Sequence, residues 1–146
     1  MPTHLSHSTH ETRDIGKELA RTLVGGDIVV LKGELGAGKT AFTKGIAEGL
    51  KIAKEVTSPT FTLMSVYPIE NHATIKELVH VDTYRLETYE ELLEIGIEEY
   101  LGKPNILTII EWPEKVDKLL ENKKMIIVTL EAGATTERKI TIETTY

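Results

Sequence analysis

The sequence predicts a single α/β domain, built on a mainly parallel β-sheet that is flanked by helices and has antiparallel edge strands. Three observations support this fold class. Strand-like apolar runs alternate with helical patterns over most of the chain, as in proteins with parallel sheets. A glycine-rich turn joins the strand pattern over 27–33 to the helical pattern over 39–50. The 146 residues, 40% of them hydrophobic, suffice for one packed core. We therefore expect residues 1–146 to form one domain.

The first expected helix follows a polar leader over residues 1–7, which we expect to be flexible. Ser8 and Glu11 have the spacing of a capping box at a helix N-terminus. The pair Gly25-Gly26 is expected to end the helix. Its apolar face consists of Ile15, Leu19, Thr22 and Leu23.

The middle of the chain predicts a strand, a helix, a hairpin and a second helix. The run over 27–33 predicts a buried strand, and the segment after it has apolar residues at helical spacing. Apolar runs over 58–70 and 75–87, separated by a short turn, predict a hairpin. An acidic amphipathic helix is expected over 88–102, where leucines and isoleucines are interleaved with glutamates.

The end of the chain predicts one more strand, a short helix and a closing hairpin. The strand is expected over 105–112, and Pro113 is expected to open a helix over 113–122. Two further strands are expected over 124–132 and 138–146, across a turn. We expect this hairpin to add antiparallel edges to the sheet.

The composition excludes several classes of protein. The formal net charge is −6 and the pI is about 5.4, so no positive field draws the chain to nucleic acid or to anionic lipid. The chain has no cysteine, which removes disulfides, thiolate metal sites and cysteine nucleophiles. No apolar run approaches the ~20 residues that a membrane helix needs. We expect a soluble, cytoplasmic protein without a membrane partner.

Residues 33–40 read "GELGAGKT" and match the phosphate-binding pattern G-x-x-x-x-G-K-[ST]. The expected strand before it and helix after it are the context that this pattern requires. Glycines let the backbone N–H groups approach a phosphate closely, and the helix dipole adds to the attraction. Lys39 is expected to bridge the terminal phosphates, and the Thr40 hydroxyl is expected to bind Mg²⁺. The sequence thus predicts a P-loop nucleotide-binding protein.

The sequence favours ATP over GTP and hydrolysis over transfer to a small acceptor. The one Asn-Lys pair, in "NKKM" over 122–125, lacks the aspartate that reads guanine, and a D-x-x-G switch is absent. A kinase that handles a second phosphorylated substrate commonly has an arginine-rich lid. No stretch resembles such a lid, since the arginines are scattered at Arg13, Arg21, Arg85 and Arg138.

Three later segments contain residues suited to hydrolysis. Thr60 follows Pro59 at the start of a strand pattern, where its hydroxyl is a candidate sensor of the metal or the terminal phosphate. Asp82 ends an apolar run, the position of a carboxylate that holds Mg²⁺ through water. Glu111 ends the next run, and carboxylates at that end of a parallel sheet face the ligand crevice. Each signal also has a purely structural reading, as a proline turn or as an ordinary strand end.

Taken together, "GELGAGKT", "SPTFTL", "HVDTYRL" and "IIEWPE" resemble, in this order, the motifs of the bacterial TsaE family, also called YjeE. The likeness spans nearly the whole chain. It implies an ATPase that functions in the biosynthesis of threonylcarbamoyladenosine in tRNA. The departures are mild: Glu34 replaces a common aspartate, and "DTYRL" replaces the more usual "DLYRL". Neither departure affects a proposed ligand.

The resemblance also implies roles for individual residues. It implies a switch role for Thr60 and Mg²⁺ or water-positioning roles for Asp82 and Glu111. It places Thr12, in the opening helix "HETRDIGKELA", near the adenine. Phosphate binding is implied for Gly36, Ala37, Gly38, Lys39 and Thr40. The tail of the family varies, so the segment after Glu131 supports no functional expectation.

The resemblance implies that the nucleotide is a switch for a larger assembly. TsaE-like proteins work with TsaB and with TsaD, which transfers threonylcarbamoyl to the adenosine beside the anticodon in tRNAs that read codons beginning with A. An acidic chain fits this scheme, because its partners would hold the tRNA. Two alternatives stay open: a small P-loop kinase acting on a small-molecule acceptor, and a nucleotide-dependent binding module without useful turnover.

Two charged patterns have simpler explanations than a site. His4, His7 and His10 repeat every third residue, as in some zinc sites, but they lie in the polar leader, where a solvated segment is the favoured interpretation. The glutamates of 88–102 are most simply a solvated helix face, although they also suit a basic partner surface.

Overall fold

The computed structural model describes residues 3–34, 36–53, 56, 63–83, 86–111 and 116–145. Within these residues seven strands form one sheet in the order β1-β7-β6-β2-β5-β4-β3. The strands are β1 (Thr3–Ser6), β2 (Ile28–Lys32), β3 (Met64–Pro68), β4 (Glu77–Asp82), β5 (Ile106–Glu111), β6 (Ile126–Ala132) and β7 (Arg138–Thr144). The helices are α1 (Thr9–Ala20), α2 (Lys39–Gly49), α3 (Glu90–Glu94), the 3₁₀ turn η1 (Ile97–Glu99) and α4 (Asp117–Leu120).

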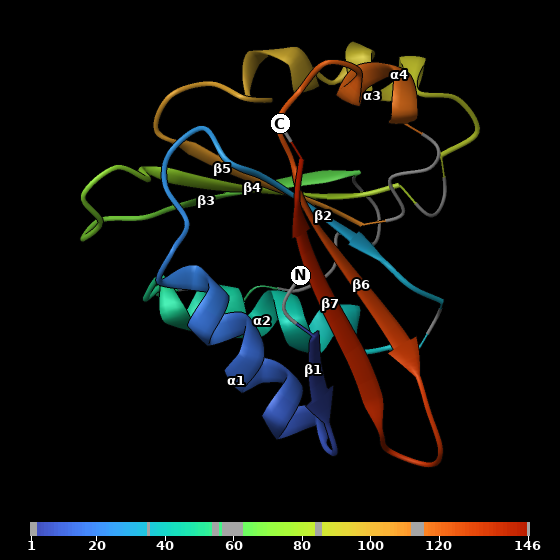
Figure 1. Ribbon diagram of the computed structural model, residues 1–146. Helices are drawn as coiled ribbons and strands as arrows, with labels where there is room; N and C mark the ends of the chain where they lie inside the picture. The colour runs from blue at the N-terminus through green and yellow to red at the C-terminus, as the bar shows by residue number, and fades with distance from the viewer. Residues whose placement is uncertain are drawn as a thin grey trace.

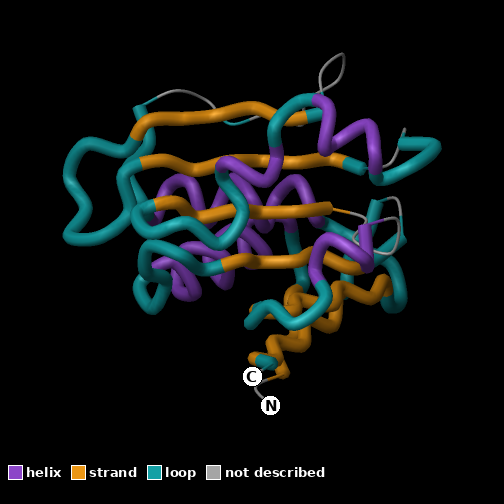
Figure 2. The backbone as a smooth tube through the Cα atoms, turned by 90° about the horizontal axis from the view of Figure 1, so that it is seen from above, coloured by secondary structure: helices purple, strands orange, loops and turns teal. Residues whose placement is uncertain are grey.

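The predicted fold class is confirmed. In the centre of the sheet β2 pairs in parallel with β5 and β6, and β4 pairs in parallel with β5. Antiparallel strands lie at both edges, with β3 beside β4 and β7 beside β6. The sheet twists strongly, so that β6 and β7 run across the direction of β3, β4 and β5 (Figure 1). Figure 2 shows the same strands from above, where β3, β4, β5 and β2 lie side by side.

Helices cover both faces of the sheet (Figure 1). Because side chains alternate along a strand, Leu31 of β2 joins a core with Phe42 and Ile46 of α2. Its neighbour Val30 joins a second core with Leu92 of α3 on the other face. The sheet therefore has an α1–α2 face and an α3–α4 face, and this division decides which strand residues lie on the side of the glycine-rich loop.

Helices α1 and α2 pack with their backbones in close approach. A Cβ atom added at Gly45 would lie only 2.0 Å from the carbonyl oxygen of Arg13, and one at Gly16 would lie 2.4 Å from that of Phe42. Arg13 also forms an ion pair with Glu48 across the two helices. Glycine is thus required at this crossing for space, which fixes α1 firmly against the helix that follows the loop.

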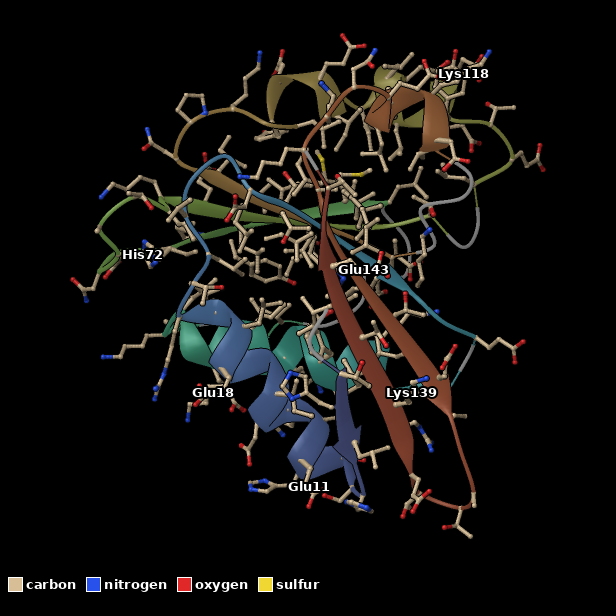
Figure 3. The ribbon with its side chains drawn as sticks, in the orientation of Figure 1. Glu11, Glu18, His72, Lys118, Lys139 and Glu143 are labelled. Carbon is tan, nitrogen blue, oxygen red and sulfur yellow. The ribbon has the colours of Figure 1, made fainter. Side chains whose placement is uncertain are left out.

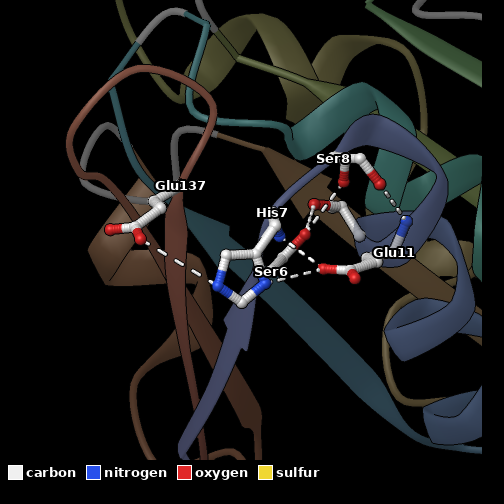
Figure 4. Close-up of polar contacts among 6 residues, drawn as sticks. Ser6, His7, Ser8, Glu11 and Glu137 are labelled. Carbon is white, nitrogen blue, oxygen red and sulfur yellow. Dashed lines mark hydrogen bonds and ion pairs between the residues drawn. The ribbon is translucent and has the colours of Figure 1, made fainter.

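The start of α1 matches the predicted cap in part. The Ser8 side chain accepts a hydrogen bond of 3.0 Å from the Glu11 backbone N–H, as a capping box requires. The Glu11 carboxylate bonds the backbone N–H of His7, one residue before the cap, and also approaches the His7 ring (Figure 4). This backbone hydrogen bond is the main reason why the pKa of Glu11 lies below its ordinary value of 4.5.

Four elements differ from the expectation, the first of them α1, which ends at Ala20 and not at Gly25-Gly26. Residues Thr3–Ser6, expected in a flexible leader, form the edge strand β1, because the open edge of β7 offers backbone partners to a mostly exposed segment. The helix expected over 88–102 is divided into α3 and η1 at Gly96, whose φ of 86° is left-handed. The helix expected over 113–122 is described only as α4, and Pro113 lies outside the described residues.

None of the helices in the described segments combines the length and the hydropathy that a membrane span requires.

Candidate nucleotide-binding site

The glycine-rich loop connects the carboxyl end of β2 to the start of α2. Gly33 is tightly enclosed, since a Cβ atom there would lie 2.6 Å from the carbonyl oxygen of Leu130 in β6. Gly38, which precedes α2 directly, has a φ of 105°, a conformation that L side chains rarely adopt. By contrast, apart from its chain neighbours, no atom of the described residues lies within 4 Å of the position of a Cβ atom at Gly36. The loop is thus tightly packed at Gly33, whereas Gly36 has space for a side chain.

The start of α2 offers backbone donors to an anion. Its cap, Gly38, has no side chain, and the first hydrogen bond within the helix runs from the Phe42 N–H to the Gly38 carbonyl, at 2.9 Å. The N–H groups of the first turn therefore have no partner within the helix. Together with the positive end of the helix dipole, they make a site that fits phosphate.

Lys39 lies in the first turn of α2 with 8% of its surface exposed. Its ammonium group bonds the carbonyl oxygen of Gly33, so the lysine side chain folds back along the loop. Thr43, one turn later, donates a hydrogen bond of 3.0 Å to the Lys39 carbonyl. Thr40, the next residue after Lys39, is exposed.

The two predicted carboxylates, Asp82 and Glu111, are neighbours at the carboxyl ends of the inner strands β4 and β5. Glu111 of β5 is in register with Asp82 of β4 on one side and with Leu31 of β2 on the other. The backbone N–H and hydroxyl of Thr83 donate to the Glu111 carbonyl at 3.2 and 2.8 Å, which fastens the two strand ends together. The topology thus brings both carboxylates to the end of the sheet from which the loop emerges.

Glu111 is buried, with 3% of its surface exposed, yet its Oε1 atom has no hydrogen-bond partner among the described residues. Buried carboxylate oxygens are normally paired, so an oxygen without a partner among the described residues is a candidate to bind a cation or a water. Glu111 and the Thr40 hydroxyl are oxygen ligands, the kind that Mg²⁺ prefers. The donor set therefore fits magnesium.

His80 is a residue of this site that the sequence analysis did not single out. It lies on β4 two positions before Asp82, and its Nε2 atom is 3.7 Å from Oε2 of Glu111. The side chain is 1% exposed, and neither ring nitrogen has a hydrogen-bond partner within the described segments. The sequence could have indicated His80, because side chains two positions apart in a strand, such as His80 and Asp82, lie on the same face.

Thr12 is adjacent to the loop but is not exposed. Its methyl group lies 3.4 Å from the position of a Cβ atom at Gly38, and its hydroxyl shares a hydrogen bond of 2.7 Å with Ser6. Thr12 is 2% exposed, so α1 supports the loop at this point. Thr60, the predicted switch residue, lies outside the described residues.

Arg138, at the start of β7, is a second basic side chain bonded to the loop. Its Nη2 atom donates a hydrogen bond of 3.2 Å to the Gly36 carbonyl, although the two residues are 102 positions apart in the sequence. No functional expectation was attached to the segment after Glu131, because the tail of the family varies.

The histidines near the N-terminus do not form a metal centre in the described part of the chain, where no group of three or more potential ligands comes together. His7 approaches Glu11 and lies 3.9 Å from Glu137, while His10 lies 3.4 Å from Asp14. These pairs are exposed, and Figure 4 shows that the His7 ring joins the start of α1 to the β6–β7 turn.

A parallel sheet whose central strand leads through a G-x-x-x-x-G-K-T loop into a helix, with carboxylates at the ends of the next two strands, defines the fold of P-loop NTPases. A family model described as "Threonylcarbamoyl adenosine biosynthesis protein TsaE" matches residues 6–140. The chain belongs to the TsaE family.

Similar proteins agree with this assignment. The tRNA threonylcarbamoyladenosine biosynthesis protein TsaE of Treponema pallidum is 40% identical over 138 residues, which cover 94% of this chain and 97% of that protein. The TsaE protein of Bacillus subtilis is 40% identical over 131 residues, covering 90% and 78%. The crystal structure of Bacillus subtilis YdiB superposes with a TM-score of 0.75 at 30% identity, covering 98% of this chain and 84% of that one.

Proposed function

We propose that this chain is a Mg²⁺-dependent ATPase that supports the threonylcarbamoyl transfer machinery, which modifies the adenosine next to the anticodon of tRNAs reading codons that begin with A. The observation that supports it best is the buried Glu111 carboxylate, which is in register between Asp82 and the strand of the phosphate loop. A buried carboxylate at that point, one oxygen of which has no hydrogen-bond partner among the described residues, suits a reaction at the terminal phosphate more than it suits packing.

In this proposal the loop binds and orients ATP. The backbone N–H groups from Gly36 to Thr40 surround the phosphates. The Lys39 ammonium group leaves the Gly33 carbonyl and binds the terminal phosphates, whose charge it neutralises. Thr12 supports the loop beside Gly38 on the side proposed for the adenine. These interactions act in the ground state, so they determine affinity.

Hydrolysis depends on the oxygen ligands and on a positioned water. Thr40 and Glu111 would hold Mg²⁺, with Asp82 acting through water, and the ion would neutralise charge that develops on the phosphate oxygens. Glu111 would also align the attacking water, while His80 lies beside its other oxygen. Thr60 is proposed as the switch hydroxyl that responds to the terminal phosphate.

The partners proposed for this chain are TsaB and TsaD, with tRNA contacted only through them. The net charge of −6 supports an indirect contact, because an acidic chain repels the phosphate backbone. We propose a cytoplasmic location and slow turnover in the absence of the partners.

The test is product analysis after incubation with ATP and Mg²⁺, first alone, then with small-molecule acceptors, and then with TsaB and TsaD. The proposal predicts free phosphate, in greater amount when the partners are present. Phosphorylation of an acceptor would show a kinase in its place, and absence of turnover under every condition would show a passive binding module.

A further inference from the structure

The contact between Arg138 and the phosphate loop extends the proposed nucleotide site to the C-terminal hairpin. Leu130 of β6 also contacts the loop. Its carbonyl oxygen limits the space at Gly33, and its side chain lies 3.6 Å from the Cβ position at Gly38. The β6–β7 hairpin thus contacts the loop at Gly33, Gly36 and Gly38.

The guanidinium group of Arg138 is held by carbonyl groups of its own turn as well as by the loop. Its Nη1 atom donates to the carbonyl oxygens of Glu137 and Thr135 at 2.8 and 3.3 Å, and its Nη2 atom donates to Gly36 at 3.2 Å. The turn that supplies these carbonyls is itself closed by hydrogen bonds between Gly133 and Glu137, at 2.8 Å, and between Glu137 and Ala134, at 2.9 Å. A planar group with fixed donors can bridge three carbonyls in this way, whereas an ammonium group is a point charge.

The contacted carbonyl belongs to the peptide unit between Gly36 and Ala37. In a trans peptide the carbonyl and the following N–H point in opposite directions. The Gly36 carbonyl points to Arg138, and the Ala37 N–H bonds the Glu34 carbonyl at 3.0 Å within the loop. Gly36 has a φ of 82°, and no described atom beyond its chain neighbours lies within 4 Å of its Cβ position, so within the described residues these two hydrogen bonds hold the peptide unit.

We propose that Arg138 is a positioning residue of the phosphate loop: it holds the peptide unit after Gly36 in one orientation and so keeps the loop in the shape that receives phosphate. The inference rests on the proposed nucleotide-binding function, which it deepens. Arg138 acts through the loop backbone, so its effect is present before any nucleotide binds.

The first test is amide hydrogen exchange in the nucleotide-free protein, with Arg138→Ala, Arg138→Lys and Lys139→Ala. Lys139 is the matched control, because it is the next residue of β7, is exposed and carries the same charge (Figure 3). Both Arg138 variants are expected to speed exchange in peptides that contain residues 33–38 several-fold, and Lys139→Ala is expected to leave it unchanged.

Three results of this test would overturn the proposal. The first is an exchange rate of the loop that is unchanged in Arg138→Ala. The second is an equal rise of the exchange rate over the whole chain, which would mean that Arg138 only stabilises the fold. The third is a wild-type exchange rate in Arg138→Lys, which would mean that charge alone is sufficient.

The second test is ADP affinity for the same variants by titration calorimetry. Arg138→Ala is expected to weaken ADP binding about tenfold, the loss typical of one charge-assisted hydrogen bond. Equal affinities in Arg138→Ala and Lys139→Ala would contradict the inference. If neither the wild type nor Lys39→Ala bound ADP, the proposed function would fail, while the exchange result would still decide the role of Arg138.

Discussion

Asp82 and Glu111 are register partners at the carboxyl ends of the adjacent parallel strands β4 and β5. Two carboxylates in this relation repel each other unless a cation, a proton or a donor lies near them. The hydroxyl and N–H of Thr83 both donate to the backbone carbonyl of Glu111, which holds the two strand ends together. In the proposed function, Mg²⁺ or an ordered water would lie beside this pair.

Lys39→Ala is expected to abolish tight ATP binding and to leave the fold intact. The ammonium group bonds a loop carbonyl in the free protein and would neutralise phosphate charge in the complex, so its loss removes affinity more than stability. Calorimetric titration with ATP measures the affinity, and a thermal melt checks the fold. Lys103→Ala, an exposed lysine remote from the loop in sequence, is the control. Unchanged affinity in Lys39→Ala would rule out the phosphate site.

Gly45→Ala should destabilise the protein by about 1–3 kcal/mol or more, as overpacked sites do. Its Cβ atom would lie 2.0 Å from the backbone oxygen of Arg13, and backbone yields less than a flexible side chain. Gly133→Ala is the matched control, because the nearest atom there is the Cβ atom of Glu137 at 3.3 Å, in an exposed turn. Urea unfolding compares the two variants, and equal midpoints would show that α1 and α2 are not packed this closely.

Glu11→Gln should lower stability at neutral pH and matter less in acid. The pKa of Glu11 is lowered in the folded state, first by the hydrogen bond from the His7 N–H, so the folded protein favours the ionised form. This stability is present above the unfolded value of about 4.5 and is lost as the pH falls through the lower folded value. Melting temperatures at pH 7 and pH 3 give the difference, which should be larger at pH 7. A constant difference would show that the charge of Glu11 is not involved.

Much of this fold could be predicted from local patterns, because parallel α/β proteins encode their strands as short apolar runs. The runs that became β2, β4, β5, β6 and β7 were visible in this way. The division of α3 from η1 was not, since the glutamates around Gly96 continue a helical pattern and only its left-handed φ interrupts the helix. Strand β1 was missed because an edge segment with one buried residue, Ser6, has no apolar periodicity.

The site was predicted as far as its residues follow strands in sequence. Asp82 and Glu111 were identified because both end apolar runs, and the parallel topology brings such ends together. His80 was missed, since a histidine within a buried strand resembles a packing residue until its ring is seen 3.7 Å from the Glu111 carboxylate. Arg138 was missed because its contact with Gly36 joins distant parts of the chain.

The central claim is that this chain hydrolyses ATP as a switch with Glu111 at the reaction centre. The most direct measurement is phosphate release by wild type and Glu111→Gln in the presence of TsaB and TsaD, alongside fluorescent-nucleotide affinity and melting temperature. The isosteric amide keeps the shape of the buried side chain and removes its charge. We predict that nucleotide affinity stays within about tenfold, roughly 1.4 kcal/mol, while turnover falls much further, since an aligned water and a held cation act mainly in the transition state. Turnover equal to wild type in Glu111→Gln would contradict the account.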